Sequence, residues 1–174
     1  MRRLGKPRAS TAPSGPSKEE RLALDVYEVL AETWGLPIFS NIAEAEATHT
    51  DAVRVLLERY DLDDPVPSRD AGEYADAELQ AAYDEFVALG TRSLEDALRV
   101  GAMIEELDIA DLRARSAGAP DVAQVFDNLE RGSRNHLRAF VGQLEQRGFD
   151  HAATYLTQAE VDEILGGDIE RGGA

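Results

Sequence analysis

The sequence contains no cysteine among its 174 residues. Without thiols the chain cannot form disulfides, thiolate zinc sites, iron–sulfur clusters or a thiol nucleophile. Any metal site must therefore be built from carboxylate oxygens and imidazole nitrogens. Cysteine usage also gives no indication of the redox compartment, because the residue that would report it is missing.

Positive charge and long apolar runs are scarce as well. The formal net charge is −16, and the only lysines are Lys6 and Lys18. Such a charge repels phosphate backbones, so we expect no nucleic-acid partner and instead an affinity for cations or basic surfaces. No apolar stretch approaches the roughly 20 residues that a membrane helix requires. We therefore expect a soluble, cytoplasmic protein with no membrane partner.

The residues that are present predict an all-α fold. Alternating β-branched runs are nearly absent, whereas alanine, leucine, glutamate and arginine are abundant. The basic and then Pro/Ser-rich start has no hydrophobic segment after its charges, so residues 1–16 are expected to form a disordered tail. We expect one helical domain over residues 17–165 and a flexible tail over 166–174.

Capping residues and glycine stops divide the domain into helices. Four long helices are predicted over residues 17–34, 37–60, 94–116 and 121–147. A short helix over 77–89, capped by Asp76, lies in the connection between the second and third long helices, and another begins after Thr157. This order predicts a four-helix bundle with a long crossover and a C-terminal helix folded back on it.

The second long helix carries two ionisable residues, Glu46 and His49, in an otherwise apolar stripe. The stripe at helical spacing also contains Phe39, Ile42, Val53, Leu56 and Tyr60. An unpaired carboxylate in a bundle core costs several kcal/mol, so Glu46 and His49 need each other, another partner or a metal. Their i, i+3 spacing directs both side chains to one spot. The alternative is a solvated pair at the edge of the stripe.

The last long helix repeats this pattern around His136. Its apolar line consists of Val122, Phe126, Leu129, Ser133, Phe140 and Leu144. A single buried helical histidine is usually a hydrogen-bonded core residue. Because two of the chain's three histidines lie in the middle of apolar helix faces, a metal site and a hydrogen-bonded core are equally good interpretations.

The remaining carboxylate candidates lie on the first and third long helices. On helix 94–116, Asp108 faces inward and Glu105 lies at the boundary, while Glu106 is expected on the exposed face. Gly101 in this helix indicates close helix approach or room for something bound. Glu19 and Glu20 open the first helix, where acidic residues favour the helix dipole and where a capping-box glutamate belongs.

These residues resemble a known group of proteins. Glu20 to Tyr27 match the ExxAxxxY pattern of rubrerythrin-type ferritin-like domains, and Ile42 to His49 match their IAxxExxH pattern. More closely, the ordered segments EERLALDVY, WGLPIFSNIAEAEATHTDAV, GAMIEELDIADL and GSRNHLRAF resemble the prokaryotic ferritin-like domain family of unknown function numbered 2202. The resemblance covers roughly residues 17–165.

The resemblance implies a ferritin-like fold with metal ligands at Glu20, Glu46, His49 and Glu105. The chain departs from a complete di-iron pattern, because the positions before His136 are Ser133 and Asn135 rather than carboxylates. Four alternatives remain open: Asp108 substitutes, the site holds one metal, it holds a different metal, or it holds none.

If iron binds, the implied chemistry is oxidation of Fe(II) by oxygen or peroxide. Glu46 and Glu105 would hold or bridge the metal, His49 and His136 would be nitrogen ligands, and Tyr27 would be a hydrogen-bond or one-electron partner. Manganese, zinc and copper are alternative cofactors. The rival hypothesis is a non-catalytic helical module with a degenerate site and an acidic partner-binding surface. A homodimer through exposed helix faces is a further expected association.

Overall fold

The computed structural model describes residues 16–64, 66, 70–115 and 119–171. Within these ranges the chain forms six α-helices and no strand. The helices are α1 (Pro16–Trp34), α2 (Pro37–Arg59), α3 (Ala77–Gly90), α4 (Leu94–Ala114), α5 (Pro120–Glu145) and α6 (Gln158–Gly166). The all-α expectation is confirmed, and residues 1–15 of the predicted tail lie outside the described part of the chain.

Three of the expected helix-capping residues act as predicted, at the starts of α3, α4 and α6. Oδ1 of Asp76 accepts hydrogen bonds from the first backbone N–H groups of α3, and Ser93 caps α4 in the same way. Thr157 and Glu160 form a reciprocal capping box at the start of α6. Each cap satisfies donors that a helix start leaves unpaired, which explains why these three helices begin where they were expected to.

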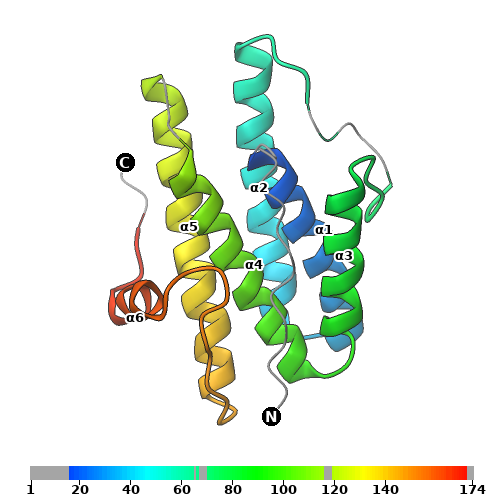
Figure 1. Cartoon of the computed structure of the whole chain (residues 1–174), viewed down its shortest axis with the longest axis vertical. Helices are drawn as coiled ribbons and strands as arrows, with labels where there is room; N and C mark the ends of the chain where they lie inside the picture. Colours follow the sequence, from blue (N-terminus) through cyan, green and yellow to red (C-terminus); the bar gives the residue numbers. More distant parts are fainter. Residues whose placement is uncertain (1–15, 65, 67–69, 116–118, 172–174) are drawn as a thin grey trace.

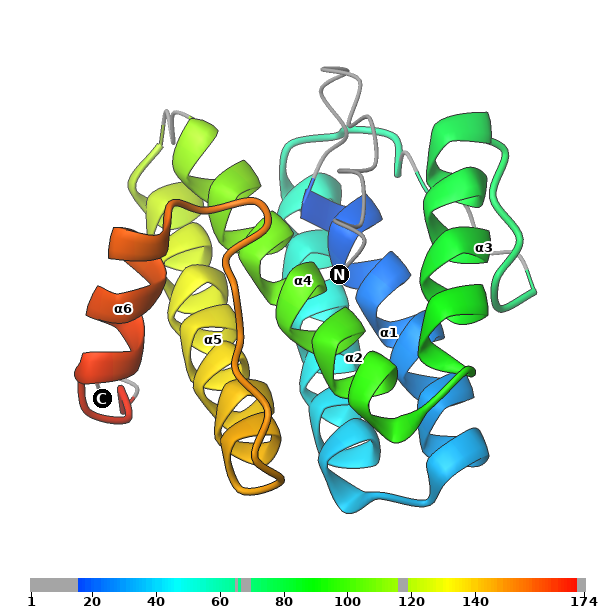
Figure 2. The same ribbon diagram turned by 60° about the horizontal axis from the view of Figure 1, so that its bottom comes forward.

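The four long helices surround a common interior. α1 packs against α2 and α4, and α5 packs against α4 and α2, so the four close into a ring. α3 lies against α1 and α4 on one flank, and α6 lies against α5 on the other (Figures 1 and 2). The buried apolar side chains inside this ring include Tyr27, Phe39, Leu98, Ile104 and Phe140. No helix among the described residues combines the length and the apolar composition that a membrane crossing requires.

Gly101 allows close approach between α4 and α5. A Cβ atom at this position would lie 2.5 Å from Cε1 of Phe140, a distance that side-chain carbons do not adopt. The Phe140 ring fills the space and packs against Tyr27 and Phe39, with ring centroids 5.3 and 5.7 Å away. Of the two roles expected for Gly101, close packing is therefore the one the structure supports.

Glu106 anchors the segment between α5 and α6. Its Oε2 accepts hydrogen bonds from the backbone N–H groups of Thr154, Tyr155 and Leu156 at 2.7, 2.8 and 3.0 Å, and Nε2 of His151 lies 2.7 Å from Oε1. This segment runs along the outside of α4 and α5 before α6 begins (Figure 2). Glu106 is fully buried, so its expected exposure was wrong: a distant loop covers the face that the helical pattern assigned to solvent.

Candidate metal centre

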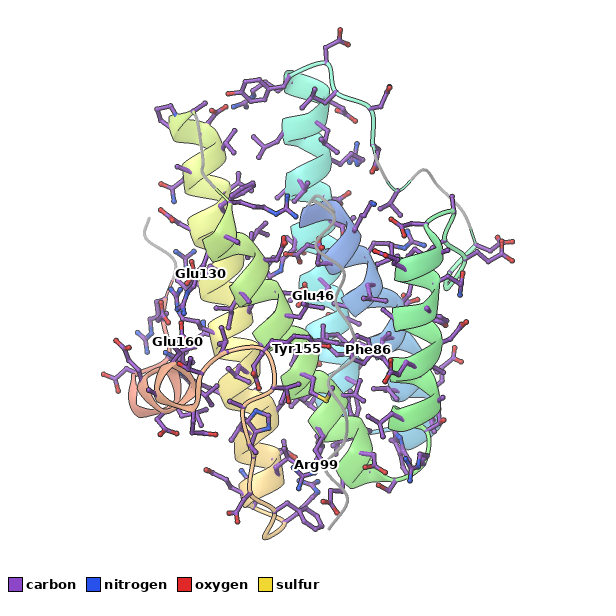
Figure 3. All side chains as sticks on the ribbon, viewed as in Figure 1. Glu46, Phe86, Arg99, Glu130, Tyr155 and Glu160 are labelled. Atoms are coloured by element: carbon purple, nitrogen blue, oxygen red, sulfur yellow. The ribbon has the colours of Figure 1, made fainter. Side chains whose placement is uncertain are left out.

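Glu46 lies at the centre of the ring of long helices. It sits near the middle of α2 and is fully buried (Figure 3). Its neighbours along the stripe, Phe39, Ile42, Val53 and Leu56, are buried as expected, whereas Tyr60 is exposed. The carboxylate is therefore directed into the interior by the same periodicity that buries the apolar side chains.

The first group of candidate ligands joins α1 to α2. Nδ1 of His49 lies 3.0 Å from Oε2 of Glu20 and 3.0 Å from Oε2 of Glu46, in hydrogen-bonding geometry with both. One ligand atom from each of the three residues lies within 4.8 Å of the other two. Glu20, 1% exposed, thus reaches this group from the first turns of α1.

The second group joins α2 to α4 and α5. Nδ1 of His136 lies 2.8 Å from Oε1 of Glu46 and 3.5 Å from Oε2 of Glu105. His136 thus forms ion pairs with both carboxylates, although the three atoms are not aligned for hydrogen bonds. The two histidine rings are stacked with centroids 5.7 Å apart, which places the two groups side by side.

Asp108 is buried next to these groups but belongs to neither. Both of its carboxylate oxygens are buried without a hydrogen-bond partner. Burial raises the pKa of Asp108 well above its usual range, and the nearby charges of Glu20, Glu105 and Glu46 raise it further. These charges show that Asp108 faces the same interior region from α4. Its oxygens are not among the closely grouped ligand atoms of the described residues.

The imidazoles hold most of the positive charge in this interior. Burial lowers the pKa of His49, but hydrogen bonds with Glu20 and Glu46 outweigh it and raise the pKa to about 11. Burial likewise opposes the charged form of His136, yet the charges and contacts of Glu105 and Glu46 raise its pKa to about 10. Both rings are therefore protonated at neutral pH.

The buried carboxylates differ in the direction in which their pKa values are shifted. Burial alone would raise the pKa of Glu46, but its contacts with His136 and His49 hold the pKa below its usual range. Burial, together with the charge of Glu46, raises the pKa of Glu20 well above its usual range. The pKa of Glu105 is raised mainly by burial. Glu46 is consequently the carboxylate that stays ionised between the two rings.

Tyr27 is placed to orient Glu105. Its hydroxyl donates a hydrogen bond of 2.7 Å to Oε1 of Glu105 and lies 3.3 Å from the backbone oxygen of Gly101. The ring is fully buried. Burial, followed by the charge of Glu105, raises the pKa of the hydroxyl well above its usual range, so the hydroxyl remains a donor. Oε2 of Glu105 is left facing His136.

Ser133 and Asn135 of α5 stand where a complete di-iron pattern would have a carboxylate, and their side chains make different contacts. Ser133 is buried, and its hydroxyl donates back to the oxygen of Leu129 at 3.3 Å, so it adds no charge to the interior. Asn135 points the other way, where its side-chain amide pairs with the backbone N–H and oxygen of Glu170. Part of the predicted tail, 166–174, is therefore held on α5; residues 172–174 lie outside the described ranges.

Comparison with known proteins places this arrangement in a family. Residues 17–168 match the family described as Uncharacterized protein domain (DUF2202). The chain belongs to the DUF2202 family. Its resemblance to the family numbered 2202 is thereby confirmed, whereas the wider ferritin-like relationship stays a prediction.

Two comparisons with relatives cover most of this DUF2202 chain. Uncharacterized protein MJ0754 of Methanocaldococcus jannaschii is 45% identical over 157 residues, which span 89% of this chain and 85% of that protein. The crystal structure titled hypothetical protein MJ0754 from Methanococcus jannaschii has a TM-score of 0.86 and 40% identity, covering 98% of this chain and 100% of that one. The helix arrangement is therefore shared with a solved structure.

Gly132 lies against His49, one of the candidate ligands, and was not identified from the sequence of this DUF2202 protein. A Cβ atom at this position of α5 would lie 2.5 Å from Cε1 and 2.7 Å from Nε2 of His49. The signal was available, because glycine inside a helix costs about 1 kcal/mol relative to alanine and indicates a close approach. Gly101 and Gly132 give the same signal in the sequence, and both lie at close contacts.

Proposed function

We propose that this DUF2202 protein is a ferritin-like metal protein that holds two iron ions in its interior. One ion would lie among Glu20, Glu46 and His49, and the other among Glu46, Glu105 and His136. The supporting observation is that the two oxygens of Glu46 face two different groups of ligand atoms, Oε2 toward His49 and Oε1 toward His136. A carboxylate in this position would bridge the ions.

The distances fit a pair of metal sites. Two ligand atoms that each lie about 2.1 Å from one ion can be no more than about 4.2 Å apart. The His49 contacts of 3.0 Å and the His136 contacts of 2.8 and 3.5 Å are within this limit. Buried polar atoms without a hydrogen-bond partner are costly, and an ion would satisfy Oε1 of Glu46, Oε2 of Glu105 and Nδ1 of His136 together.

The donor set favours iron over softer metals. It offers carboxylate oxygens and imidazole nitrogens without thiolate or thioether sulfur, a combination that suits iron or manganese. Zinc and copper are the alternatives that a metal analysis separates from iron. Bound iron would supply one-electron chemistry, the oxidation of Fe(II) coupled to the reduction of oxygen or peroxide.

The chain's own residues would prepare the centre for a cation. His49 and His136 carry protons in the metal-free state, and an entering ion must replace these protons because only a neutral imidazole is a ligand. Tyr27 would hold Glu105 through one oxygen and leave the other for the ion. Asp108 would supply the carboxylate that Ser133 lacks, since its two oxygens are buried and unpaired nearby.

The helix arrangement supports the ferritin-like part of the proposal. α1, α2, α4 and α5 form a closed ring around the candidate ligands, and α3 occupies the long connection between α2 and α4. A bundle with one long crossover, whose facing helices direct carboxylates and histidines inward, is typical of carboxylate-bridged metal proteins.

The decisive experiment is metal analysis of protein loaded anaerobically with Fe(II). We expect two ions per chain in the wild type and fewer than one in Glu46→Ala, because the shared carboxylate serves both sites. Glu44→Ala is the matched control, since Glu44 lies on the same helix but is exposed. Equal iron content in both variants would contradict the site assignment.

The non-catalytic module makes the opposite prediction for stability. In that case the carboxylates and histidines form only a hydrogen-bonded core. A ligand that binds the native state alone must raise the melting temperature. A melting temperature that is unchanged by Fe(II), Mn(II) and Zn(II) would therefore favour the module over the metal protein.

A further inference from the structure

The ring of His49 occupies a gap between α2 and α5 that exists because residue 132 has no side chain. The three atoms nearest to a Cβ built on Gly132 are Cε1, Nε2 and Nδ1 of His49, at 2.5, 2.7 and 3.8 Å. The first two distances are shorter than any ordinary carbon contact. Any side chain at position 132 would therefore displace the ring.

His49 has little freedom to move aside without losing its contacts. Its Nδ1 is held at 3.0 Å from both Glu20 and Glu46, and its ring stacks on His136 with centroids 5.7 Å apart. The side chain is only 16% exposed. A ring pushed away from α5 would carry Nδ1 away from at least one of the two carboxylates.

We propose that Gly132 is a positioning residue that admits His49 to the first metal site, and that this site can be lost while the second is retained. The inference rests on the proposed two-ion function. The first site, formed by Glu20, Glu46 and His49, needs the gap at position 132.

The ligand atoms of the second site are not those that this gap accommodates. They come from Glu46, Glu105 and His136. The three atoms nearest to a Cβ at position 132 all belong to His49, and none belongs to these three residues. His136 lies one helical turn beyond Gly132 on the same helix, so its backbone is carried by α5 itself. An added methyl group at position 132 should therefore act on the first site, through His49, and leave the ligands of the second in place.

The test compares Gly132→Ala with Gly142→Ala on the same helix. Alanine favours the helix at both positions, but a Cβ at Gly142 meets no atom within 4 Å. Titration of metal-free protein with Mn(II) should give two ions per chain in the wild type and in Gly142→Ala, and one in Gly132→Ala. Electron paramagnetic resonance should show a spin-coupled manganese pair in the first two proteins and an isolated ion in Gly132→Ala.

A double-mutant cycle shows whether Gly132 acts through His49. In a His49→Ala background, Gly132→Ala should leave Mn(II) binding unchanged and raise the melting temperature as Gly142→Ala does, because no ring remains to be displaced. This comparison also applies if the single variant Gly132→Ala fails to fold. A further loss of Mn(II) binding in the double variant would overturn the role assigned to Gly132.

The outcomes separate the inference from the proposed function. Two coupled ions in a folded Gly132→Ala would overturn the inference and leave the two-ion function in place. A wild type that takes up no Mn(II) and no Fe(II) would overturn both.

Discussion

Oε1 of Glu46 lies 2.8 Å from Nδ1 of His136 in an ion pair whose atoms are not aligned for a hydrogen bond. In a core that existed only for stability, such a pair would be expected to align or to be replaced by apolar groups, because a buried ion pair contributes little unless hydrogen bonds satisfy it. Glu46 instead keeps one oxygen for His49 and one for His136. This shared position makes Glu46 the residue on which the metal hypothesis depends.

The metal-free protein should lose stability as the pH rises above about 6.5. His49 and His136 keep their protons up to pKa values of about 11 and 10 in the folded state, whereas an unfolded histidine titrates near 6.5. Between these values the folded state binds more protons, so the free energy of unfolding falls with rising pH.

The raised pKa values of Glu20, Glu105 and Asp108 act in the same direction, beginning from the ordinary carboxyl range. The lowered pKa of Glu46 acts in the opposite direction, but only at acidic pH. Urea unfolding midpoints at pH 6, 7.5 and 9 in the presence of a chelator measure the effect. Saturating Mn(II) should reduce the fall, since metal and protons compete; a midpoint independent of pH would contradict the charge assignment.

Glu106→Ala should destabilise the protein strongly although Glu106 is not a proposed ligand. The substitution leaves three half-buried backbone N–H groups and His151 without their partner. A loss of about 3 kcal/mol or more in the free energy of unfolding is expected for a broken buried network. Urea unfolding measures it, with Asp127→Ala, at an exposed position of α5, as the control. A loss below about 1 kcal/mol would mean that the loop is not anchored by Glu106.

Asp108 and Ser133 should differ in their effect on metal binding. Asp108→Leu should weaken Fe(II) binding at least tenfold while raising the melting temperature of the metal-free protein, because it removes a buried carboxylate without a hydrogen-bond partner. Ser133→Ala should leave the affinity unchanged, since the Ser133 hydroxyl bonds to its own helix. Anaerobic calorimetric titration of both variants checks this. Weaker binding in Ser133→Ala than in Asp108→Leu would reverse the assignment.

Tyr27→Phe should retain the metal but hold it less tightly. The change removes the 2.7 Å hydrogen bond to Glu105 while keeping the ring that packs on Phe140. Partners that orient a ligand typically contribute tenfold to hundredfold in metal affinity, so about a tenfold increase in the dissociation constant is expected. Mn(II) titration measures it. Tyr83→Phe, on the flank of the molecule, should bind like the wild type; an equal loss in the two variants would exclude a specific role for Tyr27.

Several features could be predicted from local sequence alone. Asp76, Ser93 and Thr157 mark helix starts because a side-chain oxygen satisfies N–H groups of the same turn. Glu46 could be identified as an interior carboxylate because helical periodicity places it between apolar neighbours. The choice of Glu20 over Glu19 needed the family resemblance, since both residues open the first helix and both are buried.

The sequence by itself therefore determined the helices, their caps and the inward direction of Glu46, His49 and His136, since these depend on the spacing of residues within one helix. Only the tertiary structure decided that a distant loop buries Glu106 and that Gly132 admits the ring of His49. Periodicity gives the face on which a side chain lies. What covers that face depends on segments far apart in the chain, whose packing no local pattern encodes.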